Sequence, residues 1–340
     1  MPNDSIATLL ATFVGVLEQT PILLYLSTAL VGLLVGSFLN VLILRLPRMM
    51  EQAWRQECLE FLAAGSEPPA EADAIDSPEA SKASAPSEAS EASEASEPHR
   101  TSSPPRAAST RPHLGLAWPG SHCWSCGAAI KPWDNVPILS WLLLRGRCRA
   151  CKRRISPRYP LIEALTAVLS VLVVWQLGAT HAALAALILT WGLIALAMID
   201  LDTQLLPDSL TLPLLWLGLL LSLAGTFTDP ASAILGAASG YLLLWLVFHA
   251  FRLATGKDGM GEGDFKLLAL FGAWLGWQAV PQVIVLSSLP GALVGLALIA
   301  SGRTRAGEPI PYGPFLAMAG WISLLWGETM TEAYFQWAHP

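Results

Sequence analysis

Charged residues are scarce in this chain. Only 14% of its 340 residues are Asp, Glu, Lys or Arg, whereas 53% are hydrophobic and 14 are tryptophan. Several apolar stretches run for about 17 residues or more, close to the ~20 that cross a bilayer as a helix. This composition excludes an ordinary water-soluble domain and indicates a protein that crosses the membrane several times.

Common catalytic motifs are also missing. The sequence contains no Gly-x-Ser-x-Gly, no His-Glu-x-x-His and no P-loop, which argues against the enzyme families that these motifs mark. The stretch Gly259-x-Gly261-x-Gly263 follows no predicted strand, so we interpret it as a flexible loop and not as a phosphate-binding loop. We expect the lipid bilayer as a partner and no nucleic acid.

The apolar stretches predict an all-α polytopic membrane protein of about eight transmembrane helices, with a small zinc-binding cytoplasmic domain. The expected spans are 21–46, 158–178, 180–200, 209–226, 231–254, 264–279, 281–301 and 313–331. The first has no basic segment before it and no small-residue cleavage site, so we expect a retained helix. Pairs of glycines four residues apart are expected to allow close helix packing. They are Gly32/Gly36, Gly236/Gly240, Gly272/Gly276 and Gly291/Gly295.

Lysine and arginine occupy alternate loops between these spans. They are Arg45 and Arg48, the cluster from Arg145 to Arg158, Arg252 and Lys257, and Arg303 and Arg305. The opposite loops contain neither residue type. Because basic loops remain in the cytoplasm, we expect both termini outside it and these loops within it.

We divide the chain into four parts. They are a first transmembrane helix at 1–48, a cytoplasmic loop at 49–117, a cytoplasmic zinc domain at 118–157 and a seven-helix membrane domain at 158–340. The loop has 12 acids and 5 bases in 51–117, a net charge of −7, and its centre is low in complexity. Such a stretch cannot bury enough apolar surface to order itself, so we expect a disordered spacer or tether, with a helix continuing through 49–64.

Four of the five cysteines form two Cys-x-x-Cys pairs, Cys123 with Cys126 and Cys148 with Cys151, separated by 21 residues. Two such turns close a tetrahedron of thiolates, so we predict a structural zinc site with no open coordination position. Disulfides are the alternative, which the cytoplasmic placement disfavours. The nearby His122 is expected to be a neighbour of the metal and Cys58 a free thiol.

Two carboxylates lie at predicted ends of spans, Asp200 at the end of 180–200 and Asp264 at the start of 264–279. Asp200 meets the negative end of a helix, where no spare N–H is expected. Two acids at one membrane face form a candidate pair for acid–base hydrolysis. At this stage the hypothesis is that Asp200 holds the shared proton and Asp264 is ionised.

Simpler interpretations are available for several acids. Asp264 and Asp208 both precede apolar runs and could cap helices, and Asp202 could be a solvated loop residue. Asp134, which precedes an asparagine and is close to proline, is typical of a turn. Glu163 could read a substrate or be a packed, hydrogen-bonded residue at the interface.

Several motifs together resemble the bacterial type IV prepilin peptidases, which are bifunctional leader peptidases and N-methyltransferases. The similar segments are GSFLNVLILRLPRMM (36–50), NVPILSWLLLRGRC (135–148), ISPRYPLIEALTA (155–167), MIDLDTQLLPDSLTLPLLWLG (198–218), TGKDGMGEGDFKLLALFGAW (255–274) and PIPYGPFLAMAGW (309–321). The resemblance covers nearly all of the chain except the insertion at 65–112.

This resemblance implies an aspartic endopeptidase of the bacterial inner membrane, with its zinc domain and active site facing the cytoplasm. It implies cleavage of prepilins and pseudopilins after glycine, followed by methylation of the new N-terminal residue with S-adenosylmethionine. The catalytic pair corresponds to Asp200 and Asp264, the four cysteines to a zinc-binding set, and Gly146 to a glycine that is important for methyl transfer. No nucleotide-binding fingerprint locates the cofactor.

Two other classes of protein remain open at this stage. A transporter or channel could use Asp200 and Asp264 to relay ions or protons, although no internal repeat supports this. An assembly scaffold held by zinc would tolerate the loss of both acids.

Overall fold

The computed structural model describes residue 15 and residues 20–64, 115–118, 120–257, 259–303 and 310–338. The chain forms two units, Met1–Met49 with Gly115–Pro340, and Met50–Leu114. In the second unit the described residues are helical and continue the helix of the first, as expected for 49–64. The acidic insertion at 65–112 lies outside the described residues.

The described residues confirm the all-α class. The helices are α2 (Pro21–Ala64), η1 (Pro132–Asn135), α3 (Leu139–Leu143), α4 (Arg158–Leu177), α5 (His181–Thr203), α6 (Asp208–Ser222), α7 (Pro230–Thr255), α8 (Glu262–Leu275), α9 (Ala279–Ala300) and α10 (Gly313–Ala338). Each of the eight expected spans corresponds to one of the eight longer helices. Among the described residues, β-pairing is limited to two isolated β-bridges.

Five helices in the described ranges are long and apolar enough to cross a membrane: α2, α4, α5, α7 and α9. Helices α6 and α8 have 15 and 14 residues. At 1.5 Å per residue they extend about 22 Å, less than the ~30 Å hydrocarbon core. The protein is therefore a multi-pass membrane protein, while the count of eight spans stays a prediction.

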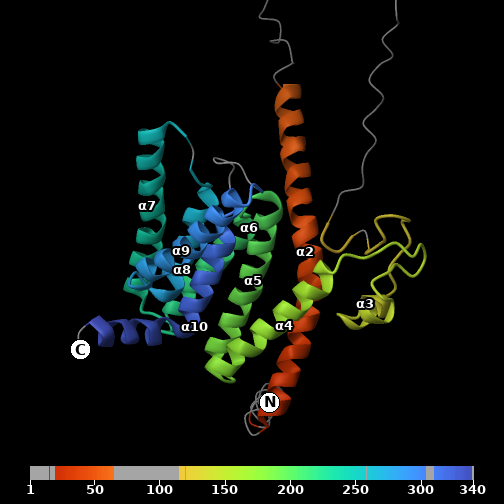
Figure 1. The fold of residues 1–340 in the computed structure, drawn as a ribbon, viewed down its shortest axis with the longest axis horizontal. Helices are drawn as coiled ribbons and strands as arrows, with labels where there is room; N and C mark the ends of the chain where they lie inside the picture. The colour runs from red at the N-terminus through yellow and green to blue at the C-terminus, as the bar shows by residue number, and fades with distance from the viewer. Residues whose placement is uncertain are drawn as a thin grey trace, which may run out of the picture. The chain divides into compact units, whose positions relative to one another are not determined.

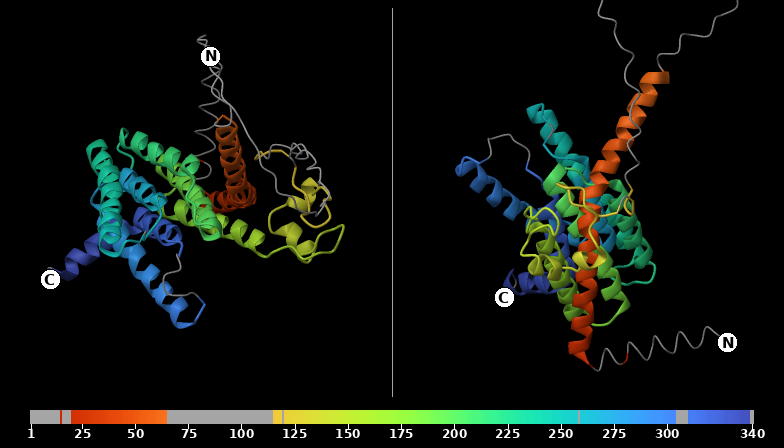
Figure 2. Two further views of the ribbon diagram at one scale, coloured as in Figure 1. Left: turned by 90° about the horizontal axis from the view of Figure 1, so that it is seen from above. Right: turned by 90° about the vertical axis from the view of Figure 1, so that its right-hand side faces the viewer.

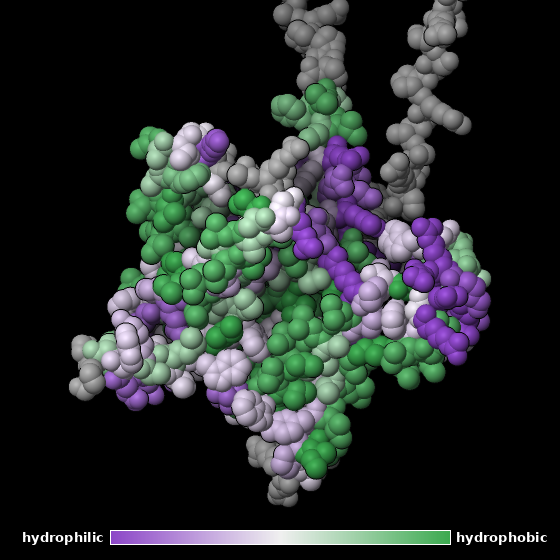
Figure 3. Space-filling model, viewed as in Figure 1, coloured by the Kyte–Doolittle hydropathy of each residue, from purple (hydrophilic) through white to green (hydrophobic). Residues whose placement is uncertain are grey.

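Helix α8 is the most enclosed of the described helices. It packs against α6, α7, α9 and α10, and its side chains from Asp264 to Trp274 are largely buried. Trp274, Phe265 and Phe271 are about fully buried in the main apolar core. Outer helices instead expose large apolar side chains, as expected for surfaces that face lipid. Figure 3 shows this hydrophobic covering over the helices, with hydrophilic residues gathered on other parts of the same face.

Glycines bring helix backbones together at three of the four predicted pairs, whereas Cβ atoms at Gly291 and Gly295 of α9 would lie 3.4 Å or more from their nearest neighbours, which are side chains. A Cβ atom on Gly272 of α8 would lie 2.0 Å from the carbonyl oxygen of Gly236 on α7. On α2, Cβ atoms at Gly32 and Gly36 would each lie 2.7 Å from a Cα atom of α4. Both views of Figure 2 show α2 beside α4. Only residues without a side chain permit these approaches.

Four helix ends meet at one end of the bundle. Figure 1 shows that the C-terminal end of α5 and the N-terminal ends of α6, α8 and α10 lie there together. Since Asp200 is near the end of α5 and Asp264 near the start of α8, the fold brings both predicted acids to the same end.

Candidate functional site

Asp200 is buried at the C-terminal end of α5, with 5% of its surface exposed. The backbone N–H of Gly313, the first residue of α10, donates a hydrogen bond to its Oδ2 atom at 3.0 Å. The end of α5 was expected to offer Asp200 no spare N–H, and the donor indeed comes from a residue 113 positions away. The N-terminal end of α10 also offsets the unfavourable dipole of α5.

Asp264 occupies the third position of α8 and is 6% exposed. The N-terminal cap of α8 is Gly261, so the capping interpretation of Asp264 is wrong. A carboxylate in the first helical turn is favoured by the dipole of its own helix, but burial removes it from water. Asp264 and Asp200 are close enough for their charges to repel one another.

Leu206, in the link between α5 and α6, lies between the two acid-bearing segments. Its Cβ atom would be 2.7 Å from a Cβ atom on Gly263, the residue before Asp264. Its Cδ1 atom would be 3.3 Å from a Cβ atom on Gly313, which contacts Asp200. One leucine side chain therefore contacts both segments.

Two ion pairs flank the acids. Arg158 of α4 binds Asp202 through two hydrogen bonds of 2.7 Å, and Lys266 of α8 binds Asp208 of α6 at 2.7 Å. Asp202 lies within α5, so its placement in a loop is wrong, while its side chain remains partly exposed. Asp208 is the first residue of α6 and makes no side-chain cap, since the cap position is Pro207.

The four predicted zinc ligands come together. The sulfurs of Cys123, Cys126, Cys148 and Cys151 all lie within 4.8 Å of one another, and the Sγ atoms of Cys123 and Cys151 are 3.8 Å apart. Tetrahedral Zn–S bonds of about 2.3 Å require sulfurs about 3.8 Å apart, so the donor set fits zinc. His122 is outside this cluster, and its Nδ1 atom is 3.0 Å from the Gly120 carbonyl. Cys58 is free and exposed, as expected.

The two Cys-x-x-Cys turns share one backbone pattern. Gly127 and Lys152 donate their N–H groups to the carbonyls of Cys123 and Cys148, four residues earlier. Both donors have positive φ, 69° and 60°. Each turn is closed by a β-bridge, His122–Ala129 in the first and Arg147–Arg154 in the second. This repetition explains why two distant sequence segments present equivalent sulfurs.

The surroundings of Cys123 and Cys126 shift the pKa values of their thiols in opposite directions. The backbone N–H groups of Ser125 and Cys126 point to the Cys123 sulfur and lower the pKa of that thiol to about 6. The N–H of Ala128 favours the Cys126 thiolate, but burial and the neighbouring sulfurs outweigh it and raise the pKa of Cys126 to about 11. Four thiolates this close therefore need a cation between them.

Gly146 has a structural role in the turn before the second cysteine pair. Its φ is +64°, and a Cβ atom there would lie 2.9 Å from the indole ring of Trp141. Its N–H binds the Trp141 carbonyl, and its own carbonyl accepts from Ile155. A left-handed backbone pressed against a ring requires glycine.

Glu163 is a packed, hydrogen-bonded residue. Its Oε2 atom accepts the backbone N–H of Ile138 at 2.7 Å, and Ser37 of α2 contributes a further hydrogen bond. Ile138 has φ of 57°, a strained value for a β-branched residue. Glu163 thus fixes the segment before α3 to α4 and α2, which favours the structural interpretation over substrate reading.

Asp134 connects two parts of the cysteine-rich region. It lies in η1 and forms three hydrogen bonds with Arg149, the shortest 2.6 Å. Arg149 holds the pKa of Asp134 below its usual value of 3.8. The turn interpretation of Asp134 is correct, with this ion pair added.

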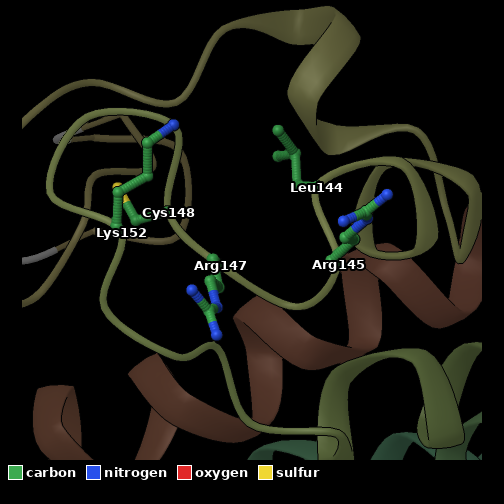
Figure 4. A pocket seen from close by; sticks show the side chains of 5 residues that line it. All are labelled: Leu144, Arg145, Arg147, Cys148 and Lys152. Atoms are coloured by element: carbon green, nitrogen blue, oxygen red, sulfur yellow. The ribbon is translucent and has the colours of Figure 1, made fainter.

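A basic cavity of about 280 Å³ adjoins the cluster and is lined by Leu144, Arg145, Arg147, Cys148 and Lys152. Figure 4 shows Cys148 and Lys152 on one side of the opening and Leu144 and Arg145 on the other. The three cationic side chains in this lining could bind an anionic group. S-adenosylmethionine also carries a sulfonium cation and an adenine ring, and this lining has no acid and no aromatic ring for them. These residues do not fit the whole cofactor.

Sequence reasoning missed Gly313 and Leu206. Both lie in segments that were matched to the family by sequence motif alone. Glycine and leucine have no side-chain group that would mark them as candidate catalytic residues. The Gly-Pro pair was the available signal, since proline is frequent at the start of a helix, where the first N–H groups have no partner within the helix.

Comparison with known proteins gives two family matches. Residues 30–177 match the Bacterial Peptidase A24 N-terminal domain, and residues 187–296 match the Type IV leader peptidase family. Curated relatives named prepilin leader peptidase/N-methyltransferase are similar over most of their length. The protein of Pseudomonas aeruginosa is 47% identical over 95% of this chain and 97% of its own. That of Stutzerimonas stutzeri is 45% identical over 96% and 99%, and that of Burkholderia pseudomallei 43% over 87% and 83%. No solved structure matches the chain.

Proposed function

The chain belongs to the type IV leader peptidase family, and on this premise we propose that Asp200 and Asp264 are the catalytic pair of its peptidase. The protein is an enzyme with two activities, removal of prepilin leaders and N-methylation. The observation that supports the pair is the burial of two mutually repelling carboxyls at one end of the bundle. A transporter or channel is not favoured.

Hydrolysis by such a pair needs one ionised and one protonated carboxyl. The ionised group takes a proton from the attacking water, while the protonated group donates to the scissile carbonyl. Because the Gly313 N–H stabilises negative charge on Asp200, we assign the anion to Asp200 and the proton to Asp264. This reverses the hypothesis based on the sequence, in which Asp200 held the proton.

The catalytic pair is tested with purified protein and a prepilin whose leader ends in glycine. Asp200→Asn and Asp264→Asn should each abolish cleavage. Asp202→Asn and Asp208→Asn, at the same end of the bundle but engaged in ion pairs, should retain most of it. Cleavage that survives both substitutions in the pair would exclude the mechanism. Methylation of an already cleaved pilin should persist in all four variants.

We propose zinc as the metal of the four-cysteine cluster. A site closed by four thiolates leaves no coordination position for substrate, so the metal would supply stability to 118–157 and no chemistry. One zinc per chain by elemental analysis, lost in Cys148→Ser, is the expected result. We propose S-adenosylmethionine as the methyl donor, since the relatives are named N-methyltransferases.

We propose the orientation that the basic loops predict. The protein would lie in the inner membrane, with the catalytic end of the bundle and the zinc domain on the cytoplasmic side. Substrate chemistry agrees, since a basic leader followed by an apolar helix has its scissile bond at that boundary. Cys58, which is free and exposed, provides the test. A membrane-impermeant maleimide should label it only after the cells are permeabilised, and Cys58→Ser should remove the signal.

A further inference from the structure

The start of α10 is built around Asp200. Gly313 is buried, and besides donating its N–H to Oδ2 at 3.0 Å it lies against the carboxylate itself. A Cβ atom there would be 2.7 Å from Oδ2 and 3.1 Å from the Asp200 Cγ atom. Any larger residue must displace the carboxylate.

Glycine is needed here for contact and not for backbone conformation. The φ angle of Gly313 is not positive. A substitution therefore costs no left-handed strain. A side chain at this position would instead collide with the Asp200 carboxylate. It would also approach Leu206, whose Cδ1 atom would be 3.3 Å from the added Cβ.

The donor is held in place before substrate arrives. The Tyr312 carbonyl accepts the N–H groups of Phe315 and Leu316, and so fixes the first turn of α10. The Tyr312 hydroxyl is 2.6 Å from the Ser287 hydroxyl on α9. The Gly313 N–H belongs to this fixed first turn and is directed at the Asp200 carboxylate. A donor fixed in advance needs no rearrangement during reaction.

We propose that Gly313 is a positioning residue for the peptidase. Its N–H orients and stabilises the Asp200 carboxylate, and its missing side chain leaves that carboxylate facing Asp264. The proposal rests on the assignment of Asp200 and Asp264 as the catalytic pair. It concerns cleavage alone, because methyl transfer is not expected to involve these acids.

The test compares Gly313→Ala with two glycines of the same helix. Gly327→Ala would place Cβ 3.5 Å from its nearest neighbour, an ordinary contact. Gly320→Ala would place it 2.1 Å from the Phe271 ring, and so disturbs packing without touching Asp200. Cleavage kcat and KM, methylation of a cleaved pilin and thermal unfolding are measured for each.

Gly313→Ala should lower kcat for cleavage about 100-fold, the effect of moving a catalytic group by about 1 Å. Its KM should change less than about threefold, and methylation should remain near that of wild type. Gly327→Ala should behave as wild type. Gly320→Ala should lower the unfolding temperature and both activities together. A Gly313→Ala protein that keeps its kcat, or that loses both activities in parallel as Gly320→Ala does, overturns the proposal.

Tyr312→Phe serves if Gly313→Ala does not fold, because it changes no volume. Loss of the hydroxyl that holds the start of α10 should lower kcat several-fold with KM and methylation unchanged. An unaltered kcat in that variant contradicts a fixed donor. If Asp200→Asn still cleaves, the catalytic pair itself is wrong. If Asp200→Asn is inactive while Gly313→Ala and Tyr312→Phe are fully active, only the positioning role fails.

Discussion

Replacing Gly272 by alanine should separate α8 from α7 and so test the packing and the active site together. The added Cβ would lie 2.0 Å from the Gly236 carbonyl oxygen and 2.2 Å from its carbon. A non-bonded carbon contact needs about 3.5 Å. Since both neighbours are backbone atoms and cannot rotate away, the helices must move apart by about 1.5 Å.

The size of the effect follows from two opposing contributions. Alanine gains about 1 kcal/mol over glycine in a helix interior. Overpacking costs about 1–3 kcal/mol, and a rigid backbone partner places this site at or above the upper end. The net loss in free energy of unfolding should be about 2 kcal/mol. In Gly291→Ala, where the nearest atom is 3.6 Å away, the helical gain should remain, so the two variants should differ by about 3 kcal/mol.

Unfolding in detergent micelles measures the first effect, and cleavage of a prepilin measures the second. Because α8 carries Asp264, a shift of about 1.5 Å should also reduce kcat by about 100-fold or more. If Gly272→Ala proves as stable and as active as Gly291→Ala, the close backbone contact of α7 with α8 is wrong.

Three further predictions concern the cysteine-rich region. Removal of metal by a chelator, or by Cys148→Ser, should abolish methylation before it affects cleavage, and equal loss of both would show that the region supports the whole bundle. The pKa of Asp134 is held below 3.8 by Arg149, so this ion pair should stabilise the region above about pH 4, and its contribution should be lost as the pH falls further. Tryptophan fluorescence should therefore show Asp134→Asn to be less stable than wild type at pH 7, with the gap closing only in strong acid. Gly146→Ala should cost about 1 kcal/mol or more from its left-handed backbone and displace Trp141, and a protein with unchanged fluorescence and zinc content would contradict this.

Much of the fold follows from local sequence. Apolar length predicts each long helix, because a helix in lipid must satisfy its own backbone. The paired spacing of Cys123, Cys126, Cys148 and Cys151 predicts their meeting, since a shared ligand chemistry implies proximity. The number of membrane crossings does not follow, because α6 and α8 are apolar in sequence but form short helices, and α8 is enclosed by its neighbours.

The site is less accessible to sequence reasoning, because its partners are distant in the chain. The carboxyl of Asp200 was notable for lacking a local N–H, and the missing donor proved to be on α10. Glu163 could not be placed either, since its partner Ile138 is 25 residues away and strained. Hydropathy and motif spacing report on local periodicity. Contacts between ends of different helices depend on how those helices rotate and cross.

The rotation of α5 and α8 also places one member of an ion pair two residues beyond each acid. Consecutive residues in a helix turn by about 100°, so a residue two positions on points roughly 200° away, to the opposite face. Asp200 and Asp264 face inward, while Asp202 and Lys266 face outward to Arg158 and Asp208. Partly exposed ion pairs contribute only about 0–1 kcal/mol each. The ion pairs therefore mark the outer faces of the helices, whereas the buried apolar side chains of α5 and α8 hold the rotation that turns each carboxyl inward.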